Sequence, residues 1–160
     1  MNGPAWHADL GGADYQIFGV RLHTDPRWIN TDGFDLHARN VHLRGVDVLN
    51  GDDSICIKAP AHDVLVEDSV VRQGNGLVVG TSDPVAISNI TFRNCTAIQT
   101  SFGCHIKFKG QQTGHVSGVV FEDITILDPV RTHPSCIESH ACMMSRQVWY
   151  KTRLHMTGLF

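Results

Sequence analysis

Three aspartates, Asp32, Asp52 and Asp53, lie between short apolar segments where most strands would carry Val, Ile or Leu. Carboxylates that are brought close together repel one another, which raises the pKa of at least one of them. Glycoside hydrolysis uses two such unequal groups, because one protonates the leaving oxygen while the other activates a water molecule. In the inverting reaction they stand about 6.5–9.5 Å apart. Carboxylates on strands about 4.8 Å apart can approach this geometry.

Aspartate is also common at turns, where its side chain bonds backbone amides. We assign Asp63 and Asp123 to turns for this reason. For Asp32, Asp52 and Asp53 we favour a catalytic role over a structural one, since a purely structural design would avoid their mutual repulsion. The chain shows no nucleophile next to a base, so acyl transfer is not expected.

Two interleaved series of short repeats indicate how these residues are positioned. In the first series, apolar residues alternate after starts that are 23, 26 and 29 residues apart, as in the coils of a solenoid. These starts are Asn40, Asp63, Asn89 and Gly118. The second series starts at Gly33, Ser54, Gly76 and Gly103. Each coil therefore contributes at least two strands.

The repeats predict an all-β fold, a right-handed parallel β-helix without helical periodicity from 28 to 129. A β-sandwich is a less favoured rival because sandwiches seldom repeat so evenly. We expect a partial β-helix domain over residues 1–130, whose first 30 residues belong to a coil with missing predecessors. Residues 131–160 lack the repeat and form an irregular, divergent tail, either a cap on the solenoid or an artefact of the gene assignment.

Stacking of the coils would bring the polar side chains together. If the starts of the second series are equivalent, the residues just before them, Asp32, Asp53 and Asn75, stack along one face of the solenoid. Asp52 would lie beside this stack. The carboxylates would then share one site.

Composition excludes several classes of protein. The 160 residues are 42% hydrophobic and 18% charged, which is typical of about one globular domain. A net charge of −3 offers no basic surface for nucleic acid. No apolar run approaches the ~20 residues that span a bilayer, so no membrane partner is expected. The first residues lack a signal peptide, so the chain is either intracellular or incomplete.

The five cysteines form no CxxC pair, which argues against zinc. Their odd number leaves at least one thiol unpaired, and we expect buried free cysteines. In a secreted chain, a bridge between Cys95 and Cys104 or between Cys136 and Cys142 remains open.

Four motifs in order carry a resemblance to a known family. The segments NTDG (30–33), NGDD (50–53), GNG (74–76) and HIK (105–107) resemble the motif set of polygalacturonases, over roughly residues 20–129. The resemblance implies a right-handed parallel β-helix that hydrolyses α-1,4 galacturonosyl bonds of pectin with inversion. It further implies a secreted protein with a pectic polysaccharide as substrate and no cofactor or metal, and we expect a monomer.

Carried over by motif position, the resemblance makes Asp52 the general acid. It makes Asp32 and Asp53 the residues that orient and deprotonate the attacking water. Among the residues that would bind the polymer, Lys107 would bind a uronate carboxylate as a point charge. Lys58 falls at the same place in its own coil, but we interpret it as an ordinary exposed residue.

Two residues depart from the family pattern. Asn75 stands where the family has histidine, and it can hydrogen-bond a carboxylate or a sugar hydroxyl without carrying charge. His105 stands where the family has arginine, so the bidentate grip on a carboxylate is lost. Both remain candidate substrate-binding residues.

Alternatives to an active polygalacturonase remain open. The chain could be an inactive pectin-binding relative, in which the carboxylates survive without turnover. It could also be an exo-acting, xylogalacturonan-type or rhamnogalacturonan-type pectinase. A lyase with Ca²⁺ held by the aspartates is less favoured, because elimination needs a basic residue near the metal.

Overall fold

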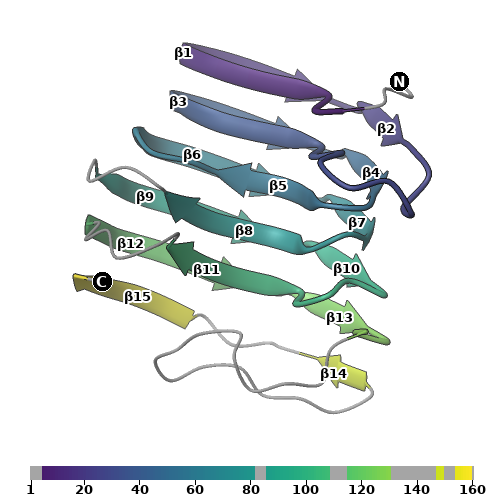
Figure 1. Cartoon of the computed structure of the whole chain (residues 1–160). Helices are drawn as coiled ribbons and strands as arrows, with labels where there is room; N and C mark the ends of the chain where they lie inside the picture. Colours follow the sequence, from purple (N-terminus) through teal and green to yellow (C-terminus); the bar gives the residue numbers. More distant parts are fainter. Residues whose placement is uncertain (1–4, 82–85, 109–114, 131–146, 150–153, 160) are drawn as a thin grey trace.

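The computed structural model describes residues 5–81, 86–108, 115–130, 147–149 and 154–159. Its strands follow one another in successive coils that stack from the N-terminal to the C-terminal end (Figure 1). The predicted all-β parallel β-helix is confirmed. The described part of the chain contains no helix of the length and apolarity needed to cross a membrane.

The strands form two hydrogen-bonded sheets. The larger has the order β11 (Cys104–Phe108), β8 (Gly76–Thr81), β5 (Asp53–Ile57), β3 (Phe34–Arg44), β6 (Ala61–Glu67), β9 (Ile87–Arg93), β12 (His115–Glu122) and β15 (Leu154–Leu159), with β1 (Ala8–Phe18) also paired to β3. The smaller has the order β14 (Gln147–Trp149), β13 (Thr125–Leu127), β10 (Thr96–Ile98), β7 (Val70–Gln73), β4 (Asp47–Asn50) and β2 (Arg21–His23).

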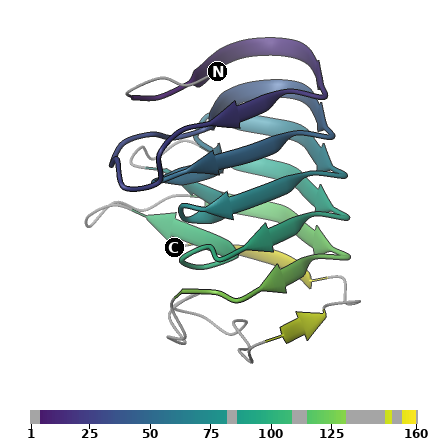
Figure 2. The same cartoon turned by 90° about the vertical axis from the view of Figure 1, so that its right-hand side faces the viewer.

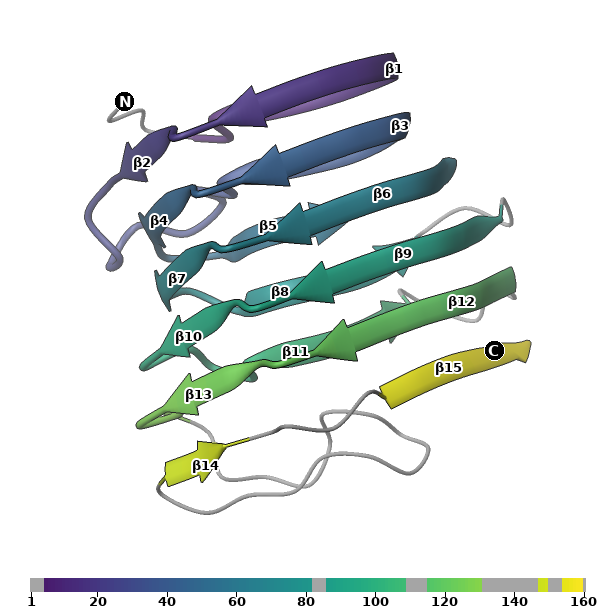
Figure 3. The same cartoon turned by 180° about the vertical axis from the view of Figure 1, so that it is seen from behind.

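The larger sheet makes two faces of the solenoid, because β3 is long enough to serve both. Residues 34–36 of β3 pair with β5, and residues 39–44 pair with β6. The smaller sheet makes the third face, on which β2, β4, β7, β10 and β13 lie one below another (Figures 2 and 3). The middle coils therefore contribute three strands, one more than the minimum that the repeats indicated.

The register confirms both series of repeats. In the first series, Val41, Val64, Ile90 and Val119 are paired from coil to coil. In the second, the aligned residues are Phe34, Ile55, Leu77 and Cys104. The second register shifts between Asp53 and Ile55, so β5 carries an irregularity where the catalytic candidates begin.

The inward side chains of all three faces pack into one core. Its largest fully buried members include Phe92, Leu36, Leu43, Ile55 and Ile57. Phe92 stacks on Phe121 of the next coil with ring centroids 5.1 Å apart. Side chains on a β-strand point alternately to its two faces, so those that point away from the core remain available to build a site.

Cys56, Cys95 and Cys104 are free thiols, so the bridge considered between Cys95 and Cys104 is not formed. Burial raises the pKa of Cys95 to about 12, which makes it an unreactive member of the core. Cys136 and Cys142 lie outside the described residues.

Two strands of the C-terminal segment pair with the last coil. β14 runs antiparallel to β13, and β15 runs antiparallel to β12. Most of residues 131–160 lie outside the described part of the chain, so the assignment of this tail as a cap or an artefact stays a prediction.

Candidate active site

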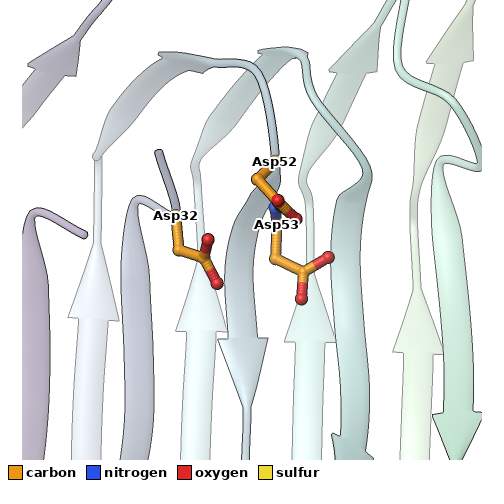
Figure 4. A group of neighbouring side chains, drawn as sticks. All are labelled: Asp32, Asp52 and Asp53. Atoms are coloured by element: carbon orange, nitrogen blue, oxygen red, sulfur yellow. Dashed lines mark hydrogen bonds between the residues drawn. The ribbon is translucent and has the colours of Figure 1, made fainter. Parts of the chain in front are cut away.

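The three aspartates singled out in the sequence meet at one end of the strands of the larger sheet. Asp32 lies just before β3, and Asp52 and Asp53 lie where β5 begins (Figure 4). One carboxylate oxygen of each lies within 4.8 Å of one from each of the other two. This is closer than the about 6.5–9.5 Å typical of inverting enzymes, so the spacing alone does not indicate inversion.

Asn50 holds the backbone of this turn, a role that the sequence analysis did not foresee. Its fully buried Nδ2 donates to the carbonyl oxygens of Thr31 (2.9 Å), Asp52 (3.0 Å) and Asp53 (2.9 Å). Its Oδ1 accepts the hydroxyl of Ser54 at 2.9 Å. A single amide therefore ties together the two loops that carry the carboxylates.

Two glycines let the neighbouring loops approach. A Cβ at Gly51 would lie 2.1 Å from the carbonyl oxygen of Trp28. A Cβ at Gly74, where φ is +47°, would lie 2.3 Å from the carbonyl oxygen of Asp52. No larger residue fits either position without moving the turn.

Asp52 is the most accessible of the three carboxylates, since it is half-buried while the other two are buried. It accepts hydrogen bonds from the backbone N–H of Asn30 (3.1 Å) and of Asp53 (2.8 Å). Asn75 donates its Nδ2 both to Asp52 (3.1 Å) and to Asp53 (2.8 Å). The structure therefore places Asn75 between two of the three carboxylates.

Asp53 is buried and paired with Lys107, which comes from β11. Burial alone would raise the pKa of Asp53, but hydrogen bonding to Lys107, its positive charge, and the donors of Asn75 and Cys56 hold it below the ordinary value. Asp53 is thus the carboxylate that stays ionised. Binding of a substrate carboxylate by Lys107 stays a prediction, and any such contact would share the ammonium with Asp53.

Asp32 has the opposite electrostatic environment. Burial and the negative charges of Asp35, Asp52 and Asp53 raise its pKa to about 7, against the lowering effect of Lys58. Only 6% of Asp32 is exposed. The proton of the cluster is therefore held most firmly at Asp32.

Lys58 is not the ordinary exposed residue that the sequence suggested. Its Nζ lies 2.6 Å from Oδ2 of Asp35 and 3.6 Å from Oδ2 of Asp32. Asp35 was missed as a candidate, although it is the outward-facing residue of the segment GFDL. Lys58 and Lys107 occupy equivalent positions in their coils, and this equivalence was the signal that could have identified Lys58 as a member of the site.

His105 lies beside this cluster without a charge partner of its own. Its ring packs against Phe102 with centroids 4.4 Å apart, and its buried Nδ1 makes no hydrogen bond. Burial, together with the charge of Lys107, lowers its pKa. His105 is therefore a neutral side chain near pH 7, unlike the arginine that the family pattern has there.

Among the described residues, the three aspartates are the group whose ligand atoms are close enough to share a cation. Hard cations such as Ca²⁺ accept carboxylate oxygens. In this site, however, the ammonium groups of Lys107 and Lys58 already neutralise Asp53 and the Asp32–Asp35 pair. We assign no metal to the site, and hydrolysis without one stays a prediction.

Comparison with known proteins places this geometry in a family. The sequence profile described as glycosyl hydrolases family 28 matches residues 1–150. The chain is 27% identical over 133 residues to "Probable exopolygalacturonase C" of Neosartorya fischeri, covering 78% of this chain and 30% of that protein. It is 32% identical over 97 residues to "Probable rhamnogalacturonase C" of Aspergillus flavus, covering 60% and 21%.

A solved structure shows the same fold. It is endopolygalacturonase I from Stereum purpureum in complex with two galacturonate molecules, and it superposes with a TM-score of 0.66 at 25% identity. The superposition covers 79% of this chain and 44% of that chain. The chain thus spans about 30% or less of the length of the curated relatives described here. From the match over residues 1–150 and the shared β-helix, we conclude that the chain belongs to glycosyl hydrolase family 28, the polygalacturonase family.

Proposed function

We propose that this chain carries the acid and base groups of a hydrolase that cleaves α-1,4 galacturonosyl bonds in pectin with inversion. The observation that carries the proposal is the cluster of Asp32, Asp52 and Asp53 within 4.8 Å, with lysines paired to its buried members. A solved relative was crystallised with galacturonate, which supports a pectic substrate.

In this proposal Asp52 is the general acid, and the proton that the resting cluster holds at Asp32 passes to Asp52 before the glycosidic bond breaks. Its accessibility suits a group that must reach the glycosidic oxygen of a polymer, and its hydrogen-bond donors fix its direction. Asp32 and Asp53 hold the attacking water on the other side of the bond. Asp53 stays ionised beside Lys107 and accepts the proton of the water, while Asp32 orients the water with it.

The polymer would be bound by neutral as well as charged groups. Asn75 lines the cluster, and His105 lies near enough to Lys107 and Asp53 to feel their charges; both would supply hydrogen-bonding groups that carry no charge near pH 7. Lys107 supplies the positive charge for a uronate carboxylate. Because pectin is an extracellular polymer, we infer that the protein acts outside the cell as a monomer, without a cofactor.

A second candidate is hydrolysis of the rhamnogalacturonan backbone. Asn75 and His105 replace the histidine and the arginine of the family pattern, and one relative is a probable rhamnogalacturonase. A backbone in which neutral sugars alternate with uronates needs fewer cationic contacts. The two substrates are separated by assaying the same sample against both polymers.

The first experiment measures release of reducing ends from polygalacturonic acid, with the anomer of the fresh product followed by NMR. We expect the inverted anomer, and a loss of about 10²–10⁴-fold in kcat in Asp52→Asn, as is typical when a general acid is removed. Asp123→Asn is the matched control, because Asp123 is an exposed turn residue with φ of 52°, which asparagine also adopts.

Each outcome decides a separate point. Unchanged turnover in Asp52→Asn would contradict the assignment of the acid. A retained anomer would contradict inversion, which the spacing of the carboxylates does not require. A folded sample that releases no product from either polymer would favour the inactive pectin-binding relative.

A further inference from the structure

Lys58 and Asp35 form an ion pair next to Asp32 that the proposed reaction does not use directly. Lys58 directly follows β5, and its Nζ lies 2.6 Å from Asp35 and 3.6 Å from Asp32. The side chains of Asp35 and Asp32 are only 3% and 9% exposed, and that of Lys58 is 33% exposed. The ammonium of this half-buried lysine therefore faces two buried carboxyl groups.

Asp35 depends on Lys58 for its own charge. The Oδ1 atom of Asp35 is buried and has no hydrogen-bond partner, while its Oδ2 atom contacts Lys58. A buried carboxylate without a partner is strongly unfavourable, so an ionised Asp35 fixes the ammonium where it is. The ammonium is then held in contact range of Asp32.

The arrangement parallels the pair formed by Lys107 and Asp53. Lys107 pairs along the sheet with Gly80 of β8, and a Cβ at Gly80 would lie 2.6 Å from Cγ of Lys107. The absence of a side chain at Gly80 leaves room for Lys107 to reach past β8 to Asp53 of β5, two coils away. Two lysines thus approach the carboxylate cluster from different coils, one for each buried aspartate.

We propose that Lys58 is a positioning residue for Asp32: anchored by Asp35, its ammonium holds the Asp32 carboxyl in the cluster and sets how readily that carboxyl ionises. The inference rests on the proposed function only in giving Asp32 a part in orienting the water. The ion pair itself, and its effect on Asp32, are independent of turnover.

The charges around Asp32 give the proposal a direction. Three carboxyl groups face Asp32: Asp35 from β3, and Asp52 and Asp53 from the start of β5. Lys58 faces Asp32 from the end of β5, and Lys107 of β11 acts on it through Asp53. The ring of His7 contacts the carbonyl oxygen of Asp32 at 3.0 Å. Removal of the Asp35 charge should lower the pKa of Asp32, because a like charge is lost. Removal of the Lys58 charge should raise it.

The experiment follows the side-chain carboxyl carbon of Asp32 by ¹³C NMR during a pH titration, with Asp32→Asn to assign the signal. Lys58→Met is first measured in the wild type, where Asp35 anchors the ammonium, and it should raise the Asp32 midpoint there. A second series starts from Asp35→Asn, in which Asp35 no longer titrates beside Asp32. We expect the Asp32 midpoint of Asp35→Asn to fall below the wild-type value, because a like charge is lost. Addition of Lys58→Met should raise the midpoint by about 1–3 pH units, the usual effect of a charge within ~4–6 Å.

Addition of Lys58→Arg to Asp35→Asn should keep the low midpoint, because arginine retains the charge. Arg72→Met is the matched control: Arg72 is a similarly exposed cation, paired with Asp47 at 3.1 Å on the other sheet. It should leave the Asp32 midpoint in place. Circular dichroism verifies that each variant is folded.

The proposal is overturned if Lys58→Met leaves the midpoint where Asp35→Asn put it, or if arginine behaves like methionine. Should the double variant not fold, Lys58→Met and Lys58→Arg in the wild-type background still decide, because only Lys58→Met should raise the Asp32 midpoint. Since the titration needs no substrate, a chain that proves inactive would refute the proposed function without affecting this test.

Discussion

Asp32 and Asp53 show how the same side chain acquires two different proton affinities within one cluster. Both are buried, and burial by itself raises the pKa of a carboxyl group. At Asp53 the charge and hydrogen bond of Lys107 outweigh burial, whereas at Asp32 three neighbouring carboxyl groups add to it. The distance to the nearest ammonium therefore decides which aspartate keeps the proton.

The raised pKa of Asp32 predicts a cost in stability. Asp32 has a pKa of about 7 in the folded protein against an ordinary value of 3.8, so the folded state binds the proton more tightly. Its contribution to stability is complete below pH ~3.8 and is lost as the pH rises through about 7. Asp32→Asn should remove this loss and stabilise the protein at pH 8 by up to a few kcal/mol.

Urea denaturation of wild type and Asp32→Asn at pH 5 and pH 8 checks this expectation. The gain from the substitution should be larger at pH 8 than at pH 5. An equal effect at both values would show that Asp32 titrates in the folded protein as it does in the unfolded chain. Glu67 offers a contrast, because Arg93 and His42 lower its pKa and its contribution has the opposite sign.

The amide of Asn75 is expected to matter because it donates to two carboxylates at once. Asn75→Asp replaces these donors with a fourth negative charge beside Asp32, Asp52 and Asp53. We expect kcat to fall by about 10²-fold or more, the usual effect of losing a well-placed donor in an active site. The pH at which the cluster ionises should also rise.

Asn94→Asp is the control for that experiment. Asn94 donates its Nδ2 to Asp68 at 2.7 Å, in a turn outside the cluster. Its replacement should lower stability and leave kcat as in the wild type. If both variants lose the same fraction of activity, Asn75 acts on the fold and not on the reaction.

At the scale of the elements, each coil bends at residues that adopt left-handed backbone angles. One such ladder crosses β1, β3, β6, β9 and β12, with φ between 52° and 64°; its members are Asp14, Asn40, Asp63, Asn89 and Gly118. Asn40 donates to Asp14 at 2.6 Å and Asn89 donates to Asp63 at 2.5 Å. Asn, Asp and Gly tolerate this conformation better than other residues, and the amides link neighbouring coils.

Asn89→Ala should therefore destabilise the protein by about 1–2 kcal/mol, because alanine is strained at this φ and cannot donate to Asp63. Asn89→Gly should cost less, since it removes only the hydrogen bond. Urea denaturation followed by circular dichroism measures both. Equal losses would show that the hydrogen bond, and not the backbone conformation, determines the effect.

At the scale of the whole molecule, burial is uneven along the stack. All five residues of β5 are buried, whereas none of β1 is fully buried. In the described part of the chain, β1 pairs only with β3, while β6 lies between β3 and β9. In a solenoid each coil is stabilised mainly by its neighbours, so the coil with one neighbour should open first.

Hydrogen exchange measured by mass spectrometry tests this expectation. Peptides from β1 should exchange before those from β6 and β9, which are paired on both sides. Uniform exchange along the stack would indicate that the coils unfold together in one cooperative step. The order of exchange would also show whether the loop that carries Asp32 opens with the first coil.

The sequence by itself determined the β-helix, both repeat series and the meeting of the three aspartates, but not the register shift that pairs Asp53 with Gly76 instead of Asn75. It could do so because each coil has the same short pattern of inward apolar residues and turn residues. Stacking then follows from burial of those residues. The assignment of Asp123 to a turn is confirmed, since it follows β12 with φ of 52°. The assignment of Asp63 to a turn is wrong, because Asp63 lies within β6, where its φ of 57° bends the strand and its carboxylate accepts a hydrogen bond from Asn89.

Only the tertiary structure decided the contacts that run between coils on the outer surface. These contacts join segments at least 19 residues apart or follow from a tight turn. They are the pairing of Lys58 with Asp35 and Asp32, the pairing of Lys107 with Asp53, and the three carbonyl groups held by Asn50. Long polar side chains on the outside can reach several neighbours. Which neighbour they contact depends on the distances between coils, and these are set by packing of the whole solenoid.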